Sequence, residues 1–354
     1  MAKDVKVVIS LATSTGGVGF GYPLIFEGKA TKAIAYTECS SIDEVINVVG
    51  GITSEDTEEA IATKTEAAKA TNIYKAALLL FMQDNAPSTI AVCATTEVAT
   101  TGLASILHYG WRQLIVTSLD TEGEDTRKAI SAYIETTEDK MYFTSATAVS
   151  EITGENAIDG NDRTVILVHK DEDTTIVFPE SALVGSTAGK AAGSITYKNQ
   201  MLKGLTAKIL SNTELNAIHE ANAMAFVLKS GDGVTSEGKS TGGEYIDIVD
   251  STDYIVQNIT YQTEKLLHQV DKVPYDNAGI SMLENVCVNV LKNAANNGII
   301  ALTDAGVPDF SVSYKPRSET ATADRAARRY IEGSFRFALA GAIHTVEVNG
   351  TIEI

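Results

Sequence analysis

Apolar residues recur at every second position near both ends of the 354-residue chain, which is the period of a strand that buries one face. Near the start these positions are Val5, Val7 and Ile9. Near the other end they are Phe335, Phe337, Val346, Val348, Ile352 and Ile354. Free termini fray unless something holds them, and an unpaired strand edge is a template for pairing with another chain. Two interpretations therefore stay open: a C-terminal hairpin that closes at Asn349 and Gly350, or strands lent to a neighbouring copy.

A glycine-rich loop follows the first predicted strand and contains Gly16, Gly17 and Gly19. An extended N-terminal arm on a flexible joint is the simplest account of this pattern. Gly17, Gly19 and Gly21 do not form a dinucleotide-binding fingerprint, because their spacing is GxGxG and no clear helix follows them. Pro23 and the apolar positions over residues 30–37 predict further strand instead.

Helical and strand patterns alternate through the first half of the chain. Apolar residues spaced by seven positions predict one long amphipathic helix that begins near Thr53 and stops near Asn85. Short apolar runs follow at residues 90–94, 114–116, 141–143 and 165–168, with helices predicted over 103–108 and 124–135. This alternation is typical of a parallel sheet wrapped by helices. The small residues over 185–193 predict close packing of two backbones.

The pattern changes beyond about residue 200 and predicts a mixture of helices and antiparallel strands. The expected elements are a helix that opens at Thr213, a hairpin of strands over 224–228 and 245–249, helices from Ser251 to before Pro274 and from Ile280 to Gly298, and a short basic helix ahead of Phe335. The fold class is therefore α/β followed by α+β.

The chain is acidic, with 28 basic against 46 acidic residues and a net charge of −18. That balance argues against general affinity for nucleic acid or for an anionic membrane. No run reaches the roughly 18 apolar residues that a membrane helix needs. Lys3, Asp4 and Lys6 interrupt the stretch where a signal peptide would be apolar, so we expect neither a signal peptide nor membrane insertion.

Candidate chemistry is sparse along the whole chain. Cys39, Cys93 and Cys287 lie far apart without ligand-spaced partners, so we expect small buried thiols in a reducing cytoplasm. The histidines are scattered at positions 108, 169, 219, 268 and 344, which argues against a metal site. The segment GSTAGK at residues 185–190 is not a phosphate loop, because three rather than four residues separate its glycines and an alanine follows the lysine.

Ligands of open α/β sheets bind at the carboxyl ends of the strands. Thr117, Asp120 and His169 follow predicted strands, but they form no nucleophile elbow, phosphate loop or acid pair of recognisable spacing. We interpret Asp120 and His169 as loop and cap residues. A cytoplasmic α/β enzyme that binds a small ligand at these strand ends remains the alternative to a structural role.

An ordered series of segments runs through the second half of the chain, namely FPESA (178–182), TELN (213–216), YID (245–247), KVPYDNAG (272–279) and AGAIH (340–344). Together they resemble the contractile tail sheath proteins of phages and phage-tail-like bacteriocins, in the compact form of Gram-positive tails. The resemblance implies an outer domain with a largely parallel sheet over residues 23–195 and an inner α+β domain over 196–335. Residues 1–22 would form an N-terminal arm and hinge, and residues 336–354 a C-terminal strand arm.

This resemblance implies a structural protein that needs no cofactor and is not an enzyme. Its copies would form hexameric rings, stacked helically around an inner tail tube, with the terminal strands completing the sheets of neighbouring subunits. Gly16, Gly17 and Gly19 would act as the hinge during contraction, which drives the tube through a target cell envelope. The implied partners are further copies, the tube protein, and baseplate and tail terminator proteins. The particle would assemble in the bacterial host cytoplasm and act after release.

The resemblance also implies a basic helix that faces the tube. Arg325, Arg328 and Arg329 are the candidates in an otherwise acidic chain. The alternative is that these arginines are solvated or pair within the subunit.

Overall fold

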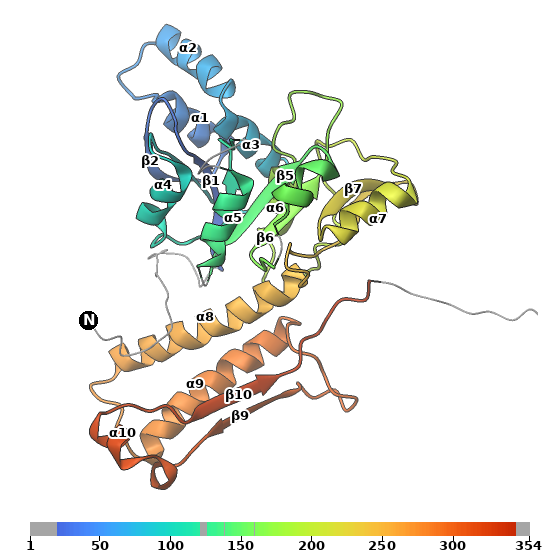
Figure 1. Cartoon of the computed structure of the whole chain (residues 1–354). Helices are drawn as coiled ribbons and strands as arrows, with labels where there is room; N and C mark the ends of the chain where they lie inside the picture. The colour runs from blue at the N-terminus through green and yellow to red at the C-terminus, as the bar shows by residue number, and fades with distance from the viewer. Residues whose placement is uncertain (1–19, 121–125, 138, 159, 345–354) are drawn as a thin grey trace, which may run out of the picture.

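The computed structural model describes residues 20–344, apart from 121–125, 138 and 159. Figure 1 shows an α/β body and a smaller body of helices and two strands, whose long helix α8 (Ile246–Gln269) lies on the side that faces the α/β body. The expected terminal strands and hinge lie outside the described residues, and this holds for Val5, Val7, Ile9, Gly16, Gly17, Gly19, Val346, Val348, Ile352 and Ile354.

An eight-stranded sheet forms the centre of the α/β body, in the order β2-β3-β1-β4-β5-β6-β7-β8. Its strands are β1 (Tyr22–Glu27), β2 (Ile34–Cys39), β3 (Ile90–Ala94), β4 (Trp111–Val116), β5 (Met141–Ala146), β6 (Thr164–Val168), β7 (Met224–Lys229) and β8 (Asp232–Thr235). The strands from β3 to β7 pair in parallel, whereas β2 and β8 pair antiparallel at the two edges. The predicted parallel sheet is confirmed.

Helices cover both faces of this sheet. They are α1 (Ile42–Gly50), α2 (Glu58–Lys69), α3 (Asn72–Phe81), α4 (Ala99–Ile106), α5 (Arg127–Glu135), α6 (Glu180–Thr187) and α7 (Asn212–Glu220). Because alternate residues of a strand face opposite ways, Ile25 packs in the core that includes α3 and α6, while Leu24 and Phe26 pack in the core that includes α4 and α5. Every residue of β3, β4 and β6 is buried, as a sheet covered on both faces requires.

The predicted single helix between Thr53 and Asn85 is wrong, because the chain forms α2 and α3 there. The Thr71 side chain accepts a hydrogen bond from the Tyr74 N–H and caps α3, as Thr57 caps α2. A threonine inside an apolar stripe is compatible with a helix interior or with a cap, so periodicity alone does not reveal the break.

The predicted strand from Tyr245 to Val249 is also wrong, since these residues are the N-cap and first turn of α8. The hairpin partner of β7 is β8, and Ser230 and Gly231 form the turn with positive φ of 54° and 96°. Ile246 and Val249 pack in the core that includes α3 and α6, and their spacing of three is helical. The alternating pattern of residues 245–249 in the sequence also fits a strand, so it did not reveal the helix.

The smaller body consists of α8, α9 (Asn277–Asn296), β9 (Phe310–Tyr314), α10 (Thr322–Ala326) and β10 (Gly333–Phe337). The strands β9 and β10 form an antiparallel sheet, and β9 packs against α9. The fully buried core of this body is small and comprises Ile255, Cys287, Leu291, Ala294, Ile299 and Ile300. Gly298, with φ of 77°, follows the end of α9, as predicted. Within the described residues, no helix is both long and apolar enough to cross a membrane.

Two predicted domain limits do not coincide with the strand pairing. The limit at residue 195 falls before β7 and β8, which continue the large sheet through the pair of Leu167 and Met224. The start of the C-terminal arm at residue 336 falls inside β10. Strand pairing joins residues far apart in sequence, so a change of local pattern does not locate it.

The predicted close packing of small residues is confirmed at α6 and the loop after it. A Cβ atom at Gly185 would lie 2.3 Å from the Leu80 carbonyl oxygen, and one at Gly189 would lie 2.1 Å from the Asn85 carbonyl oxygen. Glycine is therefore required for α6 to lie this close to α3.

Candidate functional site at the α8 junction and the β9–β10 sheet

A buried arginine joins the large sheet to α8. Arg112 lies on β4 and is 1% exposed. Its guanidinium donates to Asp250 Oδ1 at 2.5 and 3.1 Å, to Asp253 Oδ2 at 2.9 Å and to the carbonyl oxygen of Asp139 at 2.8 Å. Because both aspartates belong to α8, this one side chain fixes the helix against the sheet.

Two further side chains complete the junction. Arg163, just before β6, donates to both carboxylate oxygens of Asp253 at 2.7 and 3.0 Å. The Tyr197 hydroxyl donates to Asp250 Oδ2 at 2.8 Å. Each aspartate thus receives hydrogen bonds from two different segments of the α/β body, and its charge is compensated in a site with little water.

The electrostatics of this cluster favour a fixed structural contact over acid–base chemistry. Burial alone would lower the pKa of Arg112, but the charges of Asp250 and Asp253 raise it above its ordinary value. Burial, and then the charge of Asp250, raise the pKa of Tyr197 well above its ordinary value. Neither group exchanges a proton near neutral pH, so the cluster holds α8 in place without serving as an acid or a base.

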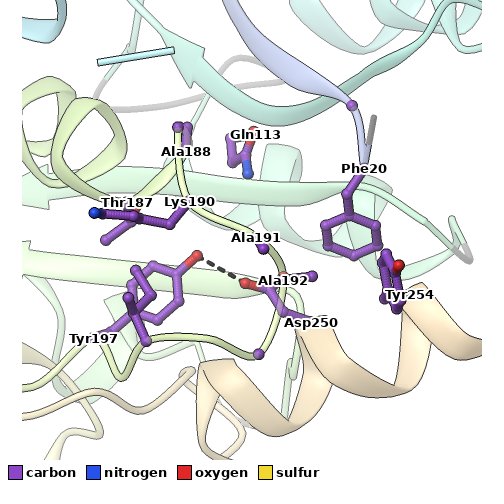
Figure 2. Close-up of a pocket in the computed structure, with 14 residues that line it drawn as sticks. Phe20, Gln113, Thr187, Ala188, Lys190, Ala191, Ala192, Tyr197, Asp250 and Tyr254 are labelled. Atoms are coloured by element: carbon purple, nitrogen blue, oxygen red, sulfur yellow. Dashed lines mark hydrogen bonds between the residues drawn. The ribbon is translucent and has the colours of Figure 1, made fainter. Parts of the chain in front are cut away.

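A cavity of about 320 Å³ lies beside this junction, and Figure 2 shows its lining. Its walls are the small residues that follow α6, together with Gln113 from β4, Phe20, and Asp250 and Tyr254 from α8. Gln113 Oε1 has no hydrogen-bond partner among the described residues. Tyr197 and Asp250 line the cavity as a hydrogen-bonded pair, but the raised pKa of Tyr197 keeps its hydroxyl protonated, so this geometry does not indicate a reaction.

The strand-end residues Thr117 and Asp120 make local contacts. The Thr117 hydroxyl donates to the Phe26 carbonyl oxygen at 3.3 Å, and Asp120 forms an ion pair with Lys29. Thr117 follows β4 while His169 follows β6, and β5 lies between those strands, which separates them by about 10 Å. The structure therefore does not bring the enzyme candidates into one constellation.

His169 is buried, and its Nε2 lies 3.1 Å from Asp171 Oδ2. Burial lowers the pKa of His169, although Asp171 opposes this shift. Burial alone would raise the pKa of Asp171, but the Thr206 N–H and the His169 ring lower it to about 2. The carboxylate thus bridges β6 and the segment before α7, which agrees with the predicted loop role.

The predicted buried thiols are confirmed, because Cys39, Cys93 and Cys287 are all buried and free. Burial raises the pKa of each thiol to about 11, which makes the reactive thiolate scarce at neutral pH. In the described part of the chain, no group of three or more His, Cys, Asp or Glu side chains is placed to hold a metal ion.

The β9–β10 ladder leaves alternate backbone groups directed outward. Ala338 N–H donates to the Asp309 carbonyl oxygen just beyond the strands, and Phe335 lies opposite Val312. In an antiparallel ladder every second pair exchanges hydrogen bonds, so the pair of Phe335 and Val312 falls in the set that does not. The backbone N–H and C=O groups of both residues therefore point away from the partner strand.

The outer edge of β10 is open in the described part of the structure. Four of the five β10 residues are exposed, and the sheet contains only β9 and β10 over 20–344. Phe335 is 40% exposed and stacks on Phe337, with ring centroids 6.2 Å apart. An exposed apolar edge of this kind is suited to pairing with one more strand.

The three arginine candidates differ in their contacts. Only Arg325 belongs to α10, and it donates to the Thr320 carbonyl oxygen, so it braces its own turn. Arg329 is 65% exposed and donates to Asp324 at 2.6 Å. Arg328 is exposed with φ of 55°, and no ion pair or hydrogen bond of its side chain exists with the described residues. The predicted basic helix ends before Arg328, because that residue adopts the left-handed conformation.

Sequence reasoning did not single out Arg112, Arg163, Asp250 or Asp253. The available signal was an arginine inside the largely apolar run WRQLIV, since a charge in a buried strand needs a partner. The partners lie 138 and 141 positions away, and only the fold identifies them.

Residues 246–352 match the family model described as E217 tail sheath protein gp31-like, C-terminal domain. This range begins at α8 and includes α9, β9, α10 and β10. A search of curated proteins finds no match to the chain.

Solved structures extend the likeness to the whole chain. The helical sheath of the anti-feeding prophage in its contracted state has a TM-score of 0.68 and 13% identity, with 100% of both chains covered. The contracted PVC sheath complex of an extracellular contractile injection system has a TM-score of 0.69 and 11% identity, with 99% of this chain and 96% of that chain covered. The sheath tail protein from Desulfitobacterium hafniense has a TM-score of 0.53 and 12% identity, with 93% and 99% covered. At these identities the likeness is one of fold.

Proposed function

We propose that this chain is the polymerising subunit of a contractile tail sheath. The fold of its whole length and the family match of its C-terminal part support this proposal. Copies would form hexameric rings that stack helically around an inner tube, and contraction would drive the tube through a target envelope. The observation that carries this proposal is the open β10 edge within the region matched to the sheath family.

The terminal segments supply strands for such an edge. The alternating apolar residues around Val7 and Val348 would add to the β9–β10 sheets of neighbouring copies, where main-chain hydrogen bonds give affinity. Each added strand would satisfy the outward N–H and C=O groups of Phe335 or Val312. The subunit sheet would then be complete only in the assembly.

Contraction needs a body that moves as one piece and arms that let it move. We propose that the α/β body forms the outer layer, that the α8–β10 body forms the inner layer, and that Gly16, Gly17 and Gly19 are the hinge. The energy would come from contacts formed between subunits, so neither a nucleotide nor a cofactor is required. Proline at Gly16 and Gly17 should block contraction but not ring formation, and normal firing would reject the hinge.

The β9–β10 region carries more positive than negative side chains, which would suit contact with an acidic surface on a partner. Between Phe310 and Phe337 the basic residues are Lys315, Arg317, Arg325, Arg328, Arg329 and Arg336, against the acidic Glu319, Asp324 and Glu332. In a chain with a net charge of −18 this is a local positive excess. Among the three candidates, Arg328 has the side chain most available for a tube contact.

The remaining partners follow from this role and belong to the proposal. A sheath ends at a baseplate and at a terminator, so we infer contacts with both, in a tail-like particle assembled in a bacterial cytoplasm. Nucleic acid and membrane are not among the proposed partners. The enzyme alternative has less support, because the strand-end residues do not converge and the matched family is one of tail sheath proteins.

The test blocks the β10 edge without breaking the subunit's own ladder. In Phe335→Pro the lost N–H is one that points away from β9, so the β9–β10 hydrogen bonds remain. We expect purified Phe335→Pro to stay folded and to form no tubes under electron microscopy, while Phe335→Ala, which keeps the N–H, still polymerises. Deletion of residues 345–354 should also abolish tubes. Tubes from both Phe335→Pro and the deletion would contradict strand donation at this edge.

A further inference from the structure

The first described residue, Phe20, is held at the α8 junction. Its ring lies 4.1 Å from the guanidinium carbon of Arg112 and 5.8 Å from the ring centroid of Tyr254, in an edge-on arrangement. Figure 2 shows Phe20 beside Tyr254 at the cavity. The body therefore holds Phe20, near the end of the predicted N-terminal arm (1–22), through a cation–π contact with a buried arginine.

The last described residue, His344, is held in a similar way. Its Nε2 lies 2.9 Å from the Thr196 hydroxyl, its Nδ1 lies 3.8 Å from Glu237 Oε1, and its ring packs edge-on at 4.9 Å against Tyr245. The side chain of His344 is 12% exposed, whereas the preceding Ile343 is 83% exposed. The segment before His344 is thus exposed to solvent. The imidazole of His344 then contacts Thr196 and Tyr245.

Both grips use the same end of α8. Tyr245 is its N-cap, and Tyr254 lies nine residues further along, about 13 Å on the helix axis and half a turn around it. Asp250 and Asp253 lie between these tyrosines in the sequence, and their ion pairs with Arg112 hold the helix against the sheet. The first turns of α8 therefore hold the α/β body and the roots of both arms in one rigid unit.

We propose that Phe20 and His344 are positioning residues that set where the two terminal arms leave the subunit. This inference rests on the proposed function, because it concerns the delivery of the lent strands. A tether that starts nearer its target strand gives a higher effective concentration for pairing. The grip on His344 therefore favours capture of the C-terminal strand by a neighbouring copy.

The length of the tether gives the size of the effect. Ala340 N–H donates to the Ile299 carbonyl oxygen, so it is the nearest backbone anchor before His344. Val346 follows His344 by two residues in the sequence and Ala340 by six, so loss of the imidazole contact would triple the chain length between the nearest anchor and Val346. For a tether longer than the span that it bridges, effective concentration falls roughly as the −3/2 power of tether length, so a three-fold longer tether gives a loss of roughly five-fold.

Full-length His344→Ala, His344→Gln and His268→Ala test this proposal. Gln keeps an N–H group that reaches towards Thr196, and His268 is an exposed histidine at the far end of α8. We expect His344→Ala to raise the concentration needed for polymerisation, followed by light scattering and electron microscopy, by roughly five-fold at an unchanged melting temperature. His344→Gln should recover part of this loss, and His268→Ala should match the wild type. Polymerisation of His344→Ala at the wild-type concentration would overturn the proposal.

Limited proteolysis separates this inference from the function on which it rests. If the wild-type chain forms no tubes under any condition, the sheath function fails, but the grip on His344 is still measurable. Elastase, which cuts after small residues, should cleave between Ala340 and His344 several-fold faster in His344→Ala than in the wild type or in His268→Ala. Equal cleavage rates would show that the imidazole does not restrain this segment.

Discussion

The strands β3 and β10 illustrate two different ways of using a sheet. All five residues of β3 are buried, with strands on both sides and helices on both faces. In β10 four of five residues are exposed, and within residues 20–344 the strand pairs only with β9 over its length. The α/β body satisfies its central backbone groups internally, whereas the smaller body leaves an edge for another strand.

The α/β body also has a larger buried core than the smaller body. The α/β body buries Trp111, Tyr142 and Phe143 among many aliphatic side chains, while the fully buried core of the smaller body has six members. Apolar burial is the main stabilising contribution to folding, so the smaller body has less of its own stability. It gains from the α8 junction and, in our proposal, from neighbouring copies.

The largest expected effect comes from breaking the junction between the bodies. Arg112→Met leaves the buried Asp250 with only the Tyr197 hydroxyl and Asp253 with only Arg163, and we expect the free energy of unfolding to fall by about 3–5 kcal/mol. Urea denaturation measures this change. Arg336→Met is the matched control, because Arg336 is 65% exposed in its pair with Asp309 and should cost less than about 1 kcal/mol. Equal losses would mean that the junction contributes no more than a surface ion pair.

The next effect is a pH dependence confined to the α/β body. Glu180 is buried at the start of α6, and its Oε2 has no hydrogen-bond partner among the described residues. Burial raises the pKa of Glu180 to about 7 from an ordinary value of 4.5, although the charge of Arg127 opposes the shift. Between pH 4.5 and pH 7 the folded state keeps a proton that the unfolded state has lost, so stability decreases as the pH rises through this window.

The loss amounts to about 3 kcal/mol and is complete above pH 7. Glu180→Gln removes the titrating group and should remove this contribution. The measurement is the difference in unfolding free energy between Glu180→Gln and the wild type at pH 5 and pH 8. As the pH rises from 5 to 8, the unfolding free energy of Glu180→Gln should increase relative to that of the wild type. Parallel pH curves would contradict the assignment to Glu180.

The smallest effect on stability is expected at the exposed arginines of the smaller body. Arg328→Glu with Arg329→Glu should lower the unfolding free energy by no more than about 1 kcal/mol, because both side chains are exposed and the pair lost is the surface ion pair of Arg329 with Asp324. The same double variant should reduce co-sedimentation with purified tubes more than it reduces self-polymerisation. Lys292→Glu, on the exposed face of α9, controls for a general change of charge. Equal reductions in both assays would remove these residues from the tube contact.

The pattern of apolar residues predicted correctly those elements whose residues fit only one type of secondary structure. The continuous apolar runs became the buried strands β3 and β6, and the heptad-like spacing after Ile280 became α9. It failed where two local structures fit the same residues. Thr71 fits a helix interior or a cap, and the segment from Tyr245 to Val249 fits a strand or a helix start.

The candidate site was predicted in part. Apolar alternation at Phe335 and Phe337 indicated a strand, and the structure places them on the open strand β10. The buried cluster around Arg112 was not predicted, because its members come from four separate segments of the chain. Arg325 shows the reverse case, since its charge suggested a surface contact but its guanidinium holds its own turn.

The amino-acid sequence by itself determined which segments bury apolar faces, where the net charge lies, and the ordered segments that resemble those of tail sheath proteins. Each of these depends on side chains that are near one another in the chain. Only the tertiary structure decided that Arg112 meets Asp250 and Asp253, that β10 keeps an open edge, and that α8 holds Phe20 and His344. These are contacts between distant residues, and their energies depend on burial that no local pattern specifies.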